Sequence, residues 1–217
     1  MRKMKYFLLP ASLFLLACGI FLFVSGGKLD AQLAFHQAFY NDSGRWIMSM
    51  VTTWGEGTLF AIVMIAFVFD RRWKMVFPLL TGAALSAVLV AFFKKVVFAP
   101  SPRPLAVLDA TQLLILDTSG IPLQFAFPSG HTTTAFVLFT MLALFTTRKV
   151  VQFALAVCAI MVALSRVYLM AHWFTDIMAG AMLGMAIAWL SVWLWKGYRQ
   201  KNPPLSARAD SKFRLPF

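Results

Sequence analysis

The stretch SRVYLMAHWFTDIMAG, residues 165–180, joins two long apolar segments of the sequence. It contains Arg166, His172 and Asp176, which an apolar environment should reject. A charged side chain at the centre of a bilayer costs about 2.5–3.5 kcal/mol, so such residues usually face a cavity or a functional site. The stretch therefore predicts two membrane helices that meet at a polar connection with a function.

The composition is that of an integral membrane protein. Of 217 residues, 60% are hydrophobic and only 13% are charged, which is far more apolar than a soluble domain. The net charge of +12 would suit a nucleic-acid-binding protein, but most basic residues lie in short clusters between apolar segments. We therefore expect no nucleic-acid partner. Cys18 and Cys158 both lie inside apolar runs, which disfavours a disulfide or a metal site.

Six apolar runs approach the roughly 20 residues that a helix needs to cross a bilayer. We therefore predict an all-α, polytopic fold with six transmembrane helices in one membrane domain, residues 1–200. The basic segment 201–217 is expected to be a disordered cytoplasmic tail. The six runs are residues 6–25, 49–69, 75–93, 131–147, 149–166 and 173–195.

The first run could instead belong to a secretory signal. MRKMK resembles the start of a signal peptide, and LLAC at 15–18 loosely resembles a lipoprotein cleavage site. Apolar sequence continues past Cys18, so we expect a retained spanning helix.

Basic residues predict the orientation of the six helices. If the helices alternate, 14 of the 20 Lys and Arg residues fall on one side, which marks it as cytoplasmic, with both termini there. We expect a bacterial inner membrane, with the other side facing the periplasm. That outer side holds residues 26–48, which predict a short helix along the interface, and a long proline-rich loop at 94–128.

His172 and Asp176 are four residues apart, which places them on one face of a helix. A carboxylate that binds one ring nitrogen fixes the tautomer and leaves the other nitrogen able to act as a nucleophile or base. The alternative is that the two side chains merely satisfy each other at the interface, beside Trp173.

The segment FPSGHTTTAF, residues 127–136, predicts the start of a helix on the same outer side. Pro128 and Ser129 favour a helix start, and Gly130 allows close approach to the backbone. Free amides at such a start form an anion site, with His131 on the first turn. The alternative is an ordinary helix cap with an interfacial histidine.

The segment KKVVFAPSPRP, residues 94–104, supplies cations with little nearby acid. Arg103 lies between Pro102 and Pro104, which stiffen its backbone. Contact with lipid headgroups is the alternative explanation.

Together these three segments contain what phosphoryl transfer requires: cations and amides that neutralise the phosphoryl oxygens, one histidine to attack and one to protonate a leaving oxygen. A zinc site made by His36, His131, His172 and Asp176 is the competing interpretation. Arginines and a lysine would repel a divalent cation, so we expect no metal.

These residues resemble the pattern of the type 2 phosphatidic acid phosphatase superfamily, membrane lipid phosphatases that also resemble vanadium haloperoxidases. The pattern is Lys-x6-Arg-Pro, Pro-Ser-Gly-His and Ser-Arg-x5-His-x3-Asp. The chain has RP at 103–104, PSGH at 128–131 and SRVYLMAHWFTD at 165–176. One position departs from the pattern, because Val96 stands where the lysine is expected. Lys95 is nearer to that place than Lys94 and is preferred, with Lys94 as the alternative.

The resemblance implies a mechanism for a motif core at 94–176. His172 would attack phosphorus to give a phosphohistidine, Asp176 would orient it, and His131 would protonate the leaving oxygen and later activate water. No cofactor is implied. The implied phosphate ligands are Lys95, Arg103, Ser129, Gly130 and Arg166.

We therefore expect a metal-independent phosphatase for a lipid phosphate or diphosphate at the outer face of the membrane. Two alternatives remain: a phosphotransferase with the same first step, and a non-enzymatic phospholipid-binding membrane protein. The substrate could be undecaprenyl diphosphate, phosphatidylglycerophosphate, phosphatidic acid or a lipid A phosphate, with specificity arising from interhelical gaps and the 105–127 loop.

Overall fold

The computed structural model describes residues 4–108 and 122–201 of the chain. In these ranges the fold consists of helices without strands, which confirms the all-α prediction. Residues 109–121 of the predicted specificity loop and residues 202–217 of the predicted tail lie outside these ranges. The helices are α1 (Lys5–Val24), α2 (Lys28–Phe39), α3 (Asp42–Thr52), η2 (Thr53–Gly55), α4 (Gly57–Phe69), α5 (Trp73–Phe92), η3 (Phe93–Val97), η4 (Pro104–Ala106), α6 (Gly130–Leu144), α7 (Lys149–Tyr168) and α8 (Phe174–Lys201).

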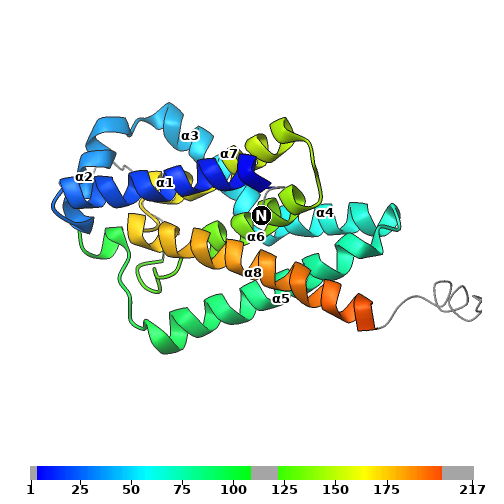
Figure 1. The fold of residues 1–217 in the computed structure, drawn as a ribbon. Helices are drawn as coiled ribbons and strands as arrows, with labels where there is room; N and C mark the ends of the chain where they lie inside the picture. The colour runs from blue at the N-terminus through cyan, green and yellow to red at the C-terminus, as the bar shows by residue number, and fades with distance from the viewer. Residues whose placement is uncertain (1–3, 109–121, 202–217) are drawn as a thin grey trace, which may run out of the picture.

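The long helices run back and forth along a common direction. In Figure 1, α1, α5 and α7 end towards the left, where α2 and α8 begin. The turn between α4 and α5, which contains Arg71 and Arg72, lies on the right with the end of α8. We call the left end the site end. It gathers three connections, at 25–27, 93–108 and 169–173, that are far apart in the sequence.

By helix length and composition, the described residues account for fewer than the predicted six membrane spans, so six spans stay a prediction. Four helical segments are long and apolar enough to cross a membrane, Lys5–Val24, Trp73–Val97, Lys149–Tyr168 and Phe174–Tyr198, and a bent pair could make a fifth. The helix α6 has only 15 residues, about 22 Å at 1.5 Å per residue, against a hydrocarbon core of roughly 30 Å. Most of its residues are buried by other helices.

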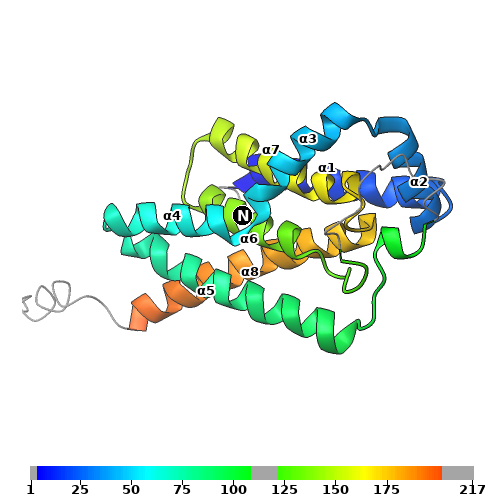
Figure 2. The ribbon, with the colours of Figure 1, turned by 180° about the vertical axis from the view of Figure 1, so that it is seen from behind.

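The predicted run 49–69 is broken in the structure. The helix α3 ends at Thr52, a short 3-10 turn follows, and α4 begins at Gly57 at an angle of 48° to the preceding segment. Figure 2 shows the two helices meeting at this bend. Its sequence, TTWGEG, is polar and has two glycines, which favour the end of a helix over its interior. An apolar average over 21 residues hid this signal.

Among the described residues, the most extensive helix packing is between α6 and α8, and two glycines bring their backbones close together. A Cβ on Gly180 would lie 2.8 Å from the carbonyl oxygen of Ser129, and one on Gly184 would lie 2.6 Å from that of Thr133. Real Cβ atoms do not approach so closely, so only glycine allows these two backbones to touch. Small residues four apart are a common device for close helix packing in membranes. This packing fixes the start of α6 against the first turns of α8.

The short helix α2 and the residue Asn41 that follows it are bound to the last turn of α7. Gln32 is buried and its Nε2 donates to the carbonyl of Val167 at 2.9 Å. The hydroxyl of Tyr168 accepts from the backbone N–H of Asn41 at 2.9 Å. The predicted short helix in 26–48 is therefore present, and it packs against the elements that carry the candidate site.

Candidate active site

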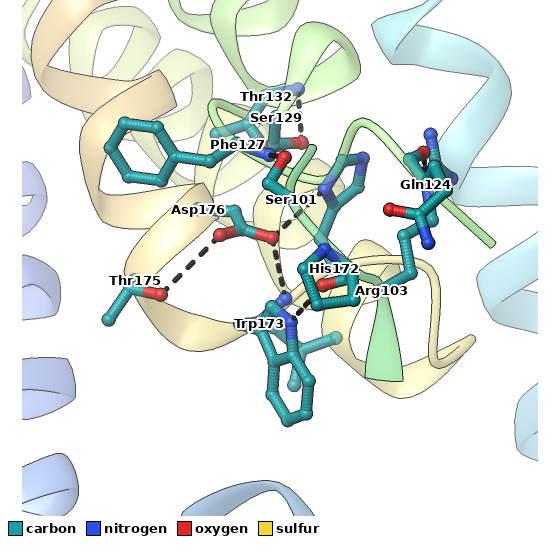
Figure 3. Close-up of polar contacts among 12 residues, drawn as sticks. Ser101, Arg103, Gln124, Phe127, Ser129, Thr132, His172, Trp173, Thr175 and Asp176 are labelled. Carbon is teal, nitrogen blue, oxygen red and sulfur yellow. Dashed lines mark hydrogen bonds and ion pairs between the residues drawn. The ribbon is translucent and has the colours of Figure 1, made fainter. Parts of the chain in front are cut away.

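His172 and Asp176 form the pair that their spacing predicted. His172 lies in the connection before α8 and Asp176 on the first turn of that helix, and His172 Nδ1 is 3.3 Å from Asp176 Oδ2. The same oxygen accepts the backbone N–H of Trp173 at 3.0 Å, and Figure 3 shows it between the two groups. Both side chains are almost fully buried. The carboxylate thus faces Nδ1, and Nε2 is the ring nitrogen turned away from it.

The connection that carries His172 is held from two sides. The backbone N–H groups of Ala171 and His172 both donate to the carbonyl of Arg166, at 3.0 and 3.2 Å. The indole N–H of Trp173 donates to the carbonyl of Pro102 at 2.8 Å, and Lys28 lies 5.0 Å from an indole ring centroid in a cation–π contact. The loop before η4 and the start of α2 therefore both help to position the histidine.

The helix start at Ser129 is as predicted. Ser129 is the N-cap of α6, and its Oγ accepts the hydroxyl of Thr132 at 2.9 Å. Its own N–H donates to the carbonyl of Asp176 at 3.1 Å. The first turn of α6, with Gly130 and His131, is thereby placed next to the first turn of α8. A Cβ on Gly130 would make only an ordinary contact with Val90, so protein packing alone does not require glycine there.

The two predicted arginines both lie at the site end, and each guanidinium uses one N–H group in a hydrogen bond with the protein. Arg166 NH1 donates to Thr52 Oγ1 at 2.7 Å, whereas its buried Nε makes no hydrogen bond among the described residues. Arg103 is buried, and its Nε donates to the carbonyl of Gln124 at 3.1 Å. Guanidinium groups bind phosphate oxygens well because their planar donors match the oxygen geometry. The buried Nε of Arg166 is a donor that such an oxygen would satisfy.

The two neighbouring lysines have different surroundings. Lys94 is half-buried in the π-helical turn η3 and acts electrostatically on both His131 and His172. Lys95 is exposed. The geometry therefore favours Lys94 over the Lys95 that the sequence spacing suggested.

The electrostatics keep His172 neutral. Burial lowers the pKa of His172 well below its ordinary value, and the positive charges of Arg166, Arg103 and Lys94 act in the same direction. A neutral imidazole with Nδ1 facing a carboxylate is the form that a nucleophile needs. The site thus places an oriented, unprotonated ring nitrogen inside a positively charged surrounding.

An apolar cavity of about 600 Å³ adjoins the site. It lies between α4 and α5, where Phe60, Met64 and Val90 are among its lining residues. At one end it reaches Lys94, Lys95 and Gly130. A long apolar chain placed there would have its head group at the cations.

Three site features were missed by the sequence reasoning: Thr52 on Arg166, Glu56 beside His131 and the Trp173 contact with Pro102. The first two lie at the bend between α3 and α4, and the unused sequence signal for that bend is the polar string TTWGEG inside an apolar run. Among the described residues, no three His, Cys, Asp or Glu side chains come together as metal ligands. The expectation that no metal takes part stays a prediction.

Two histidines, an aspartate and several cations lie at two adjoining helix starts, in a helical bundle with membrane-length helices. Such a set defines a membrane protein with a phosphoryl-transfer type of site. Comparison with known proteins agrees, because the sequence pattern of the PAP2 superfamily matches residues 75–200, more than half of the chain. The chain belongs to the PAP2 superfamily. This confirms the predicted family.

Named relatives of the chain are phosphatases. Phosphatidylglycerophosphatase B of Bacillus subtilis (strain 168) is 35% identical over 87 residues, 36% of this chain and 41% of that protein. The match thus spans less than half of that relative. Undecaprenyl-diphosphatase of Sulfolobus acidocaldarius is 28% identical over 200 residues, 88% of this chain and 92% of that protein. These relatives agree with the predicted class of enzyme.

Two solved structures share the fold. LpxE of Aquifex aeolicus has a TM-score of 0.67 at 24% identity, over 76% of this chain and 94% of that one. The transmembrane PAP2 type phosphatidylglycerolphosphate phosphatase of Bacillus subtilis has a TM-score of 0.57 at 23% identity, over 90% and 98%. At this level of identity the likeness concerns the helical architecture.

Proposed function

We propose that the protein is a metal-independent phosphatase that releases inorganic phosphate from a membrane lipid phosphate or diphosphate through a phosphohistidine. The observation that carries the proposal is the 3.3 Å pairing of His172 with Asp176 amid the charges of Arg103, Arg166 and Lys94. No other arrangement of the described residues combines a neutral, oriented histidine with so many cations.

In the first step, Nε2 of His172 attacks phosphorus and the bond from phosphorus to the leaving oxygen breaks. A proton from His131 passes to that oxygen, which leaves as the lipid alcohol, or as the lipid monophosphate if the substrate is a diphosphate. The equatorial oxygens are held by the arginines, Lys94 and the backbone N–H of Gly130 on the first turn of α6. The N–H of Ser129 is already used by the carbonyl of Asp176, so Ser129 contributes by capping this helix start. Asp176 stabilises the positive charge that develops on the imidazole of His172.

In the second step, water attacks the phosphohistidine and the bond between nitrogen and phosphorus breaks. His131, now neutral, takes the proton from the water. Inorganic phosphate leaves and both histidines return to their starting states.

The apolar cavity between α4 and α5 supports a lipid substrate. Its walls suit acyl or prenyl chains, and it ends at Lys94 and Gly130, where a phosphate would meet the cations. Undecaprenyl diphosphate, phosphatidylglycerophosphate, phosphatidic acid and lipid A phosphate all have this build. A phosphate-release assay of these four in detergent would identify the substrate.

In the membrane, α3 and α4 together would form one bent span and α6 a short central one, which would restore six spans. Because other helices surround α6, it need not match the bilayer thickness. The charge pattern then places both termini in the cytoplasm and the site end at the periplasmic face. A reporter fused to the C-terminus tests this, and a periplasmic C-terminus would refute it.

The mechanism is tested with purified protein in a chelator such as EDTA. We expect phosphate release to persist there, to disappear in His172→Ala and to remain in the control Asp30→Asn, which removes an exposed carboxylate of α2. Unchanged phosphate release by His172→Ala would contradict the mechanism. Labelled substrate separates hydrolysis from transfer to a second lipid, and binding without turnover would indicate a non-enzymatic lipid-binding protein.

A further inference from the structure

Glu56 is an acidic residue of the site that no sequence motif indicated. It lies at the bend between η2 and α4, the bend visible in Figure 2, and its Oε1 is 4.0 Å from Nε2 of His131. This is an ion-pair distance if the imidazole is protonated. Both side chains are partly exposed, so the pair lies on the open side of the site rather than in the core.

The backbone before Glu56 is pressed against His131. A Cβ on Gly55 would lie 2.8 Å from the carbonyl oxygen of His131 and 3.0 Å from its Cβ, and 2.7 Å from a methyl group of Val162. Only glycine permits this approach. The break in the helix at 53–56 therefore fixes the carboxylate of Glu56 beside the imidazole of His131.

Burial and the other charges around His131 are both unfavourable to a proton on its ring, and burial is the larger effect. Positive charge close to an imidazole opposes its protonation, and an opposite charge at about 4–6 Å favours it. Glu56 also acts electrostatically on Arg166. Asp176 is already engaged by His172 and Trp173. The charged and titratable groups that act on His131 from neighbouring elements are Arg166 of α7, His172 before α8, Lys94 of η3 and Arg103 before η4. Glu56 is the carboxylate at ion-pair distance from the ring.

We propose that Glu56 is a positioning residue for the general acid: its carboxylate fixes the orientation of the His131 imidazole and counteracts the burial and the cations that disfavour a proton on that ring, so that a proton can pass to the leaving oxygen. The proposal rests on the phosphatase function argued above. In the first step the proton moves from the imidazolium of His131 to the leaving oxygen, and Glu56 stays ionised throughout. In the second step His131 regains a proton from water, and Glu56 stabilises the imidazolium again.

The need for this proton depends on the leaving group. An aliphatic alkoxide is a poor leaving group and must be protonated as it departs, whereas p-nitrophenolate is stable without a proton. Loss of Glu56 should therefore slow the hydrolysis of a lipid monoester much more than that of p-nitrophenyl phosphate. A residue that only supports the fold would slow both substrates equally.

The test compares Glu56→Gln with the wild type on phosphatidic acid and on p-nitrophenyl phosphate. We expect kcat for the lipid to fall about 10-fold or more, kcat for the phenyl ester to fall less than about threefold, and the basic limb of the pH–rate profile to move to lower pH. Glu56→Asp keeps a carboxylate and should recover part of the lipid rate. Asp30→Asn serves as the control for removing a negative charge from the site end. Equal losses on both substrates with an unmoved pH profile, or no loss, would overturn the role.

A measurement that needs no turnover separates this proposal from the phosphatase function. The chain has three histidines, so His131 can be assigned by NMR in protein labelled with ¹⁵N-histidine. The titration midpoint of His131 should fall by about one pH unit in Glu56→Gln. An unchanged midpoint overturns the proposal even if the enzyme is active, and a shifted midpoint in an inactive wild type would refute only the phosphatase function.

Discussion

The backbone N–H of Ser129 donates to the carbonyl of Asp176 at 3.1 Å, which joins the helix start beside His131 to the helix start beside His172. The two histidines of the proposed mechanism come from segments that are 41 residues apart in the sequence. This single hydrogen bond, together with the glycine contacts between α6 and α8, sets their relative position. A reaction in which one histidine attacks phosphorus and another protonates the leaving oxygen requires the two imidazoles to be held in a fixed relative position.

Replacement of Asp176 by Asn should keep the shape of the site and remove its charge. An amide can present its N–H to Nδ1 of His172 and favour the wrong tautomer, so we expect kcat to fall about 10²-fold to 10⁴-fold. Initial rates at saturating substrate measure the effect, with Asp30→Asn as the control and thermal unfolding as a check on folding. A loss smaller than about 10-fold would show that the carboxylate does not orient a nucleophile.

The adjacent lysines provide a matched pair of variants. Lys94→Met should lower kcat/KM about 10-fold or more, because the site loses a cation that faces the phosphate. Lys95→Met makes the same chemical change on an exposed side chain and should alter kcat/KM less than about twofold. The comparison is made on one lipid substrate under one detergent condition. The reverse order would restore the Lys95 assignment that the sequence spacing suggested.

The sequence was sufficient to predict the helical class, the family and the pairing of His172 with Asp176. The pairing joins two residues four apart in the sequence, so it is a local property and survives even though His172 lies just before α8 and only Asp176 is on the helix. Which of Lys94 and Lys95 faces the site is not a local property of the sequence. It depends on how the π-helical turn η3 rotates two adjacent side chains, and residue counting does not give that rotation.

The bend at 53–56 was missed for a different reason. Apolar averages over a whole run ignore a few polar residues within it, although those residues ended the helix and brought Thr52 to Arg166 and Glu56 to His131. The length of α6 also depended on tertiary structure. A helix surrounded by other helices does not need the length that contact with lipid requires. The sequence of α6 alone does not show that other helices surround it.

The pKa of His172 should lie below that of free histidine. Because burial and nearby cations lower the pKa of His172, it should remain neutral through pH 6.5 and below. The native state then binds fewer protons at this residue than the unfolded chain, so His172 lowers the free energy of unfolding as the pH falls below about 6.5. NMR of ¹⁵N-histidine in detergent, assigned with single histidine variants, measures the midpoint without substrate. A midpoint at or above 6.5 would contradict the electrostatic argument.

Gly184→Ala should disrupt the contact between α8 and α6. The added Cβ would lie 2.6 Å from the carbonyl oxygen of Thr133 and 2.7 Å from Cβ of Phe136, so the helices must separate. We expect a loss of about 1–3 kcal/mol in stability and a lower kcat, because the first turn of α6 moves with its helix. Gly197→Ala on the same helix is the matched control, since nothing lies within 4 Å of its Cβ position. The control should keep full activity and gain about 0.5–1 kcal/mol from helix propensity. Thermal unfolding in detergent and initial rates compare the two, and equal behaviour would mean that close packing at residue 184 does not position the site.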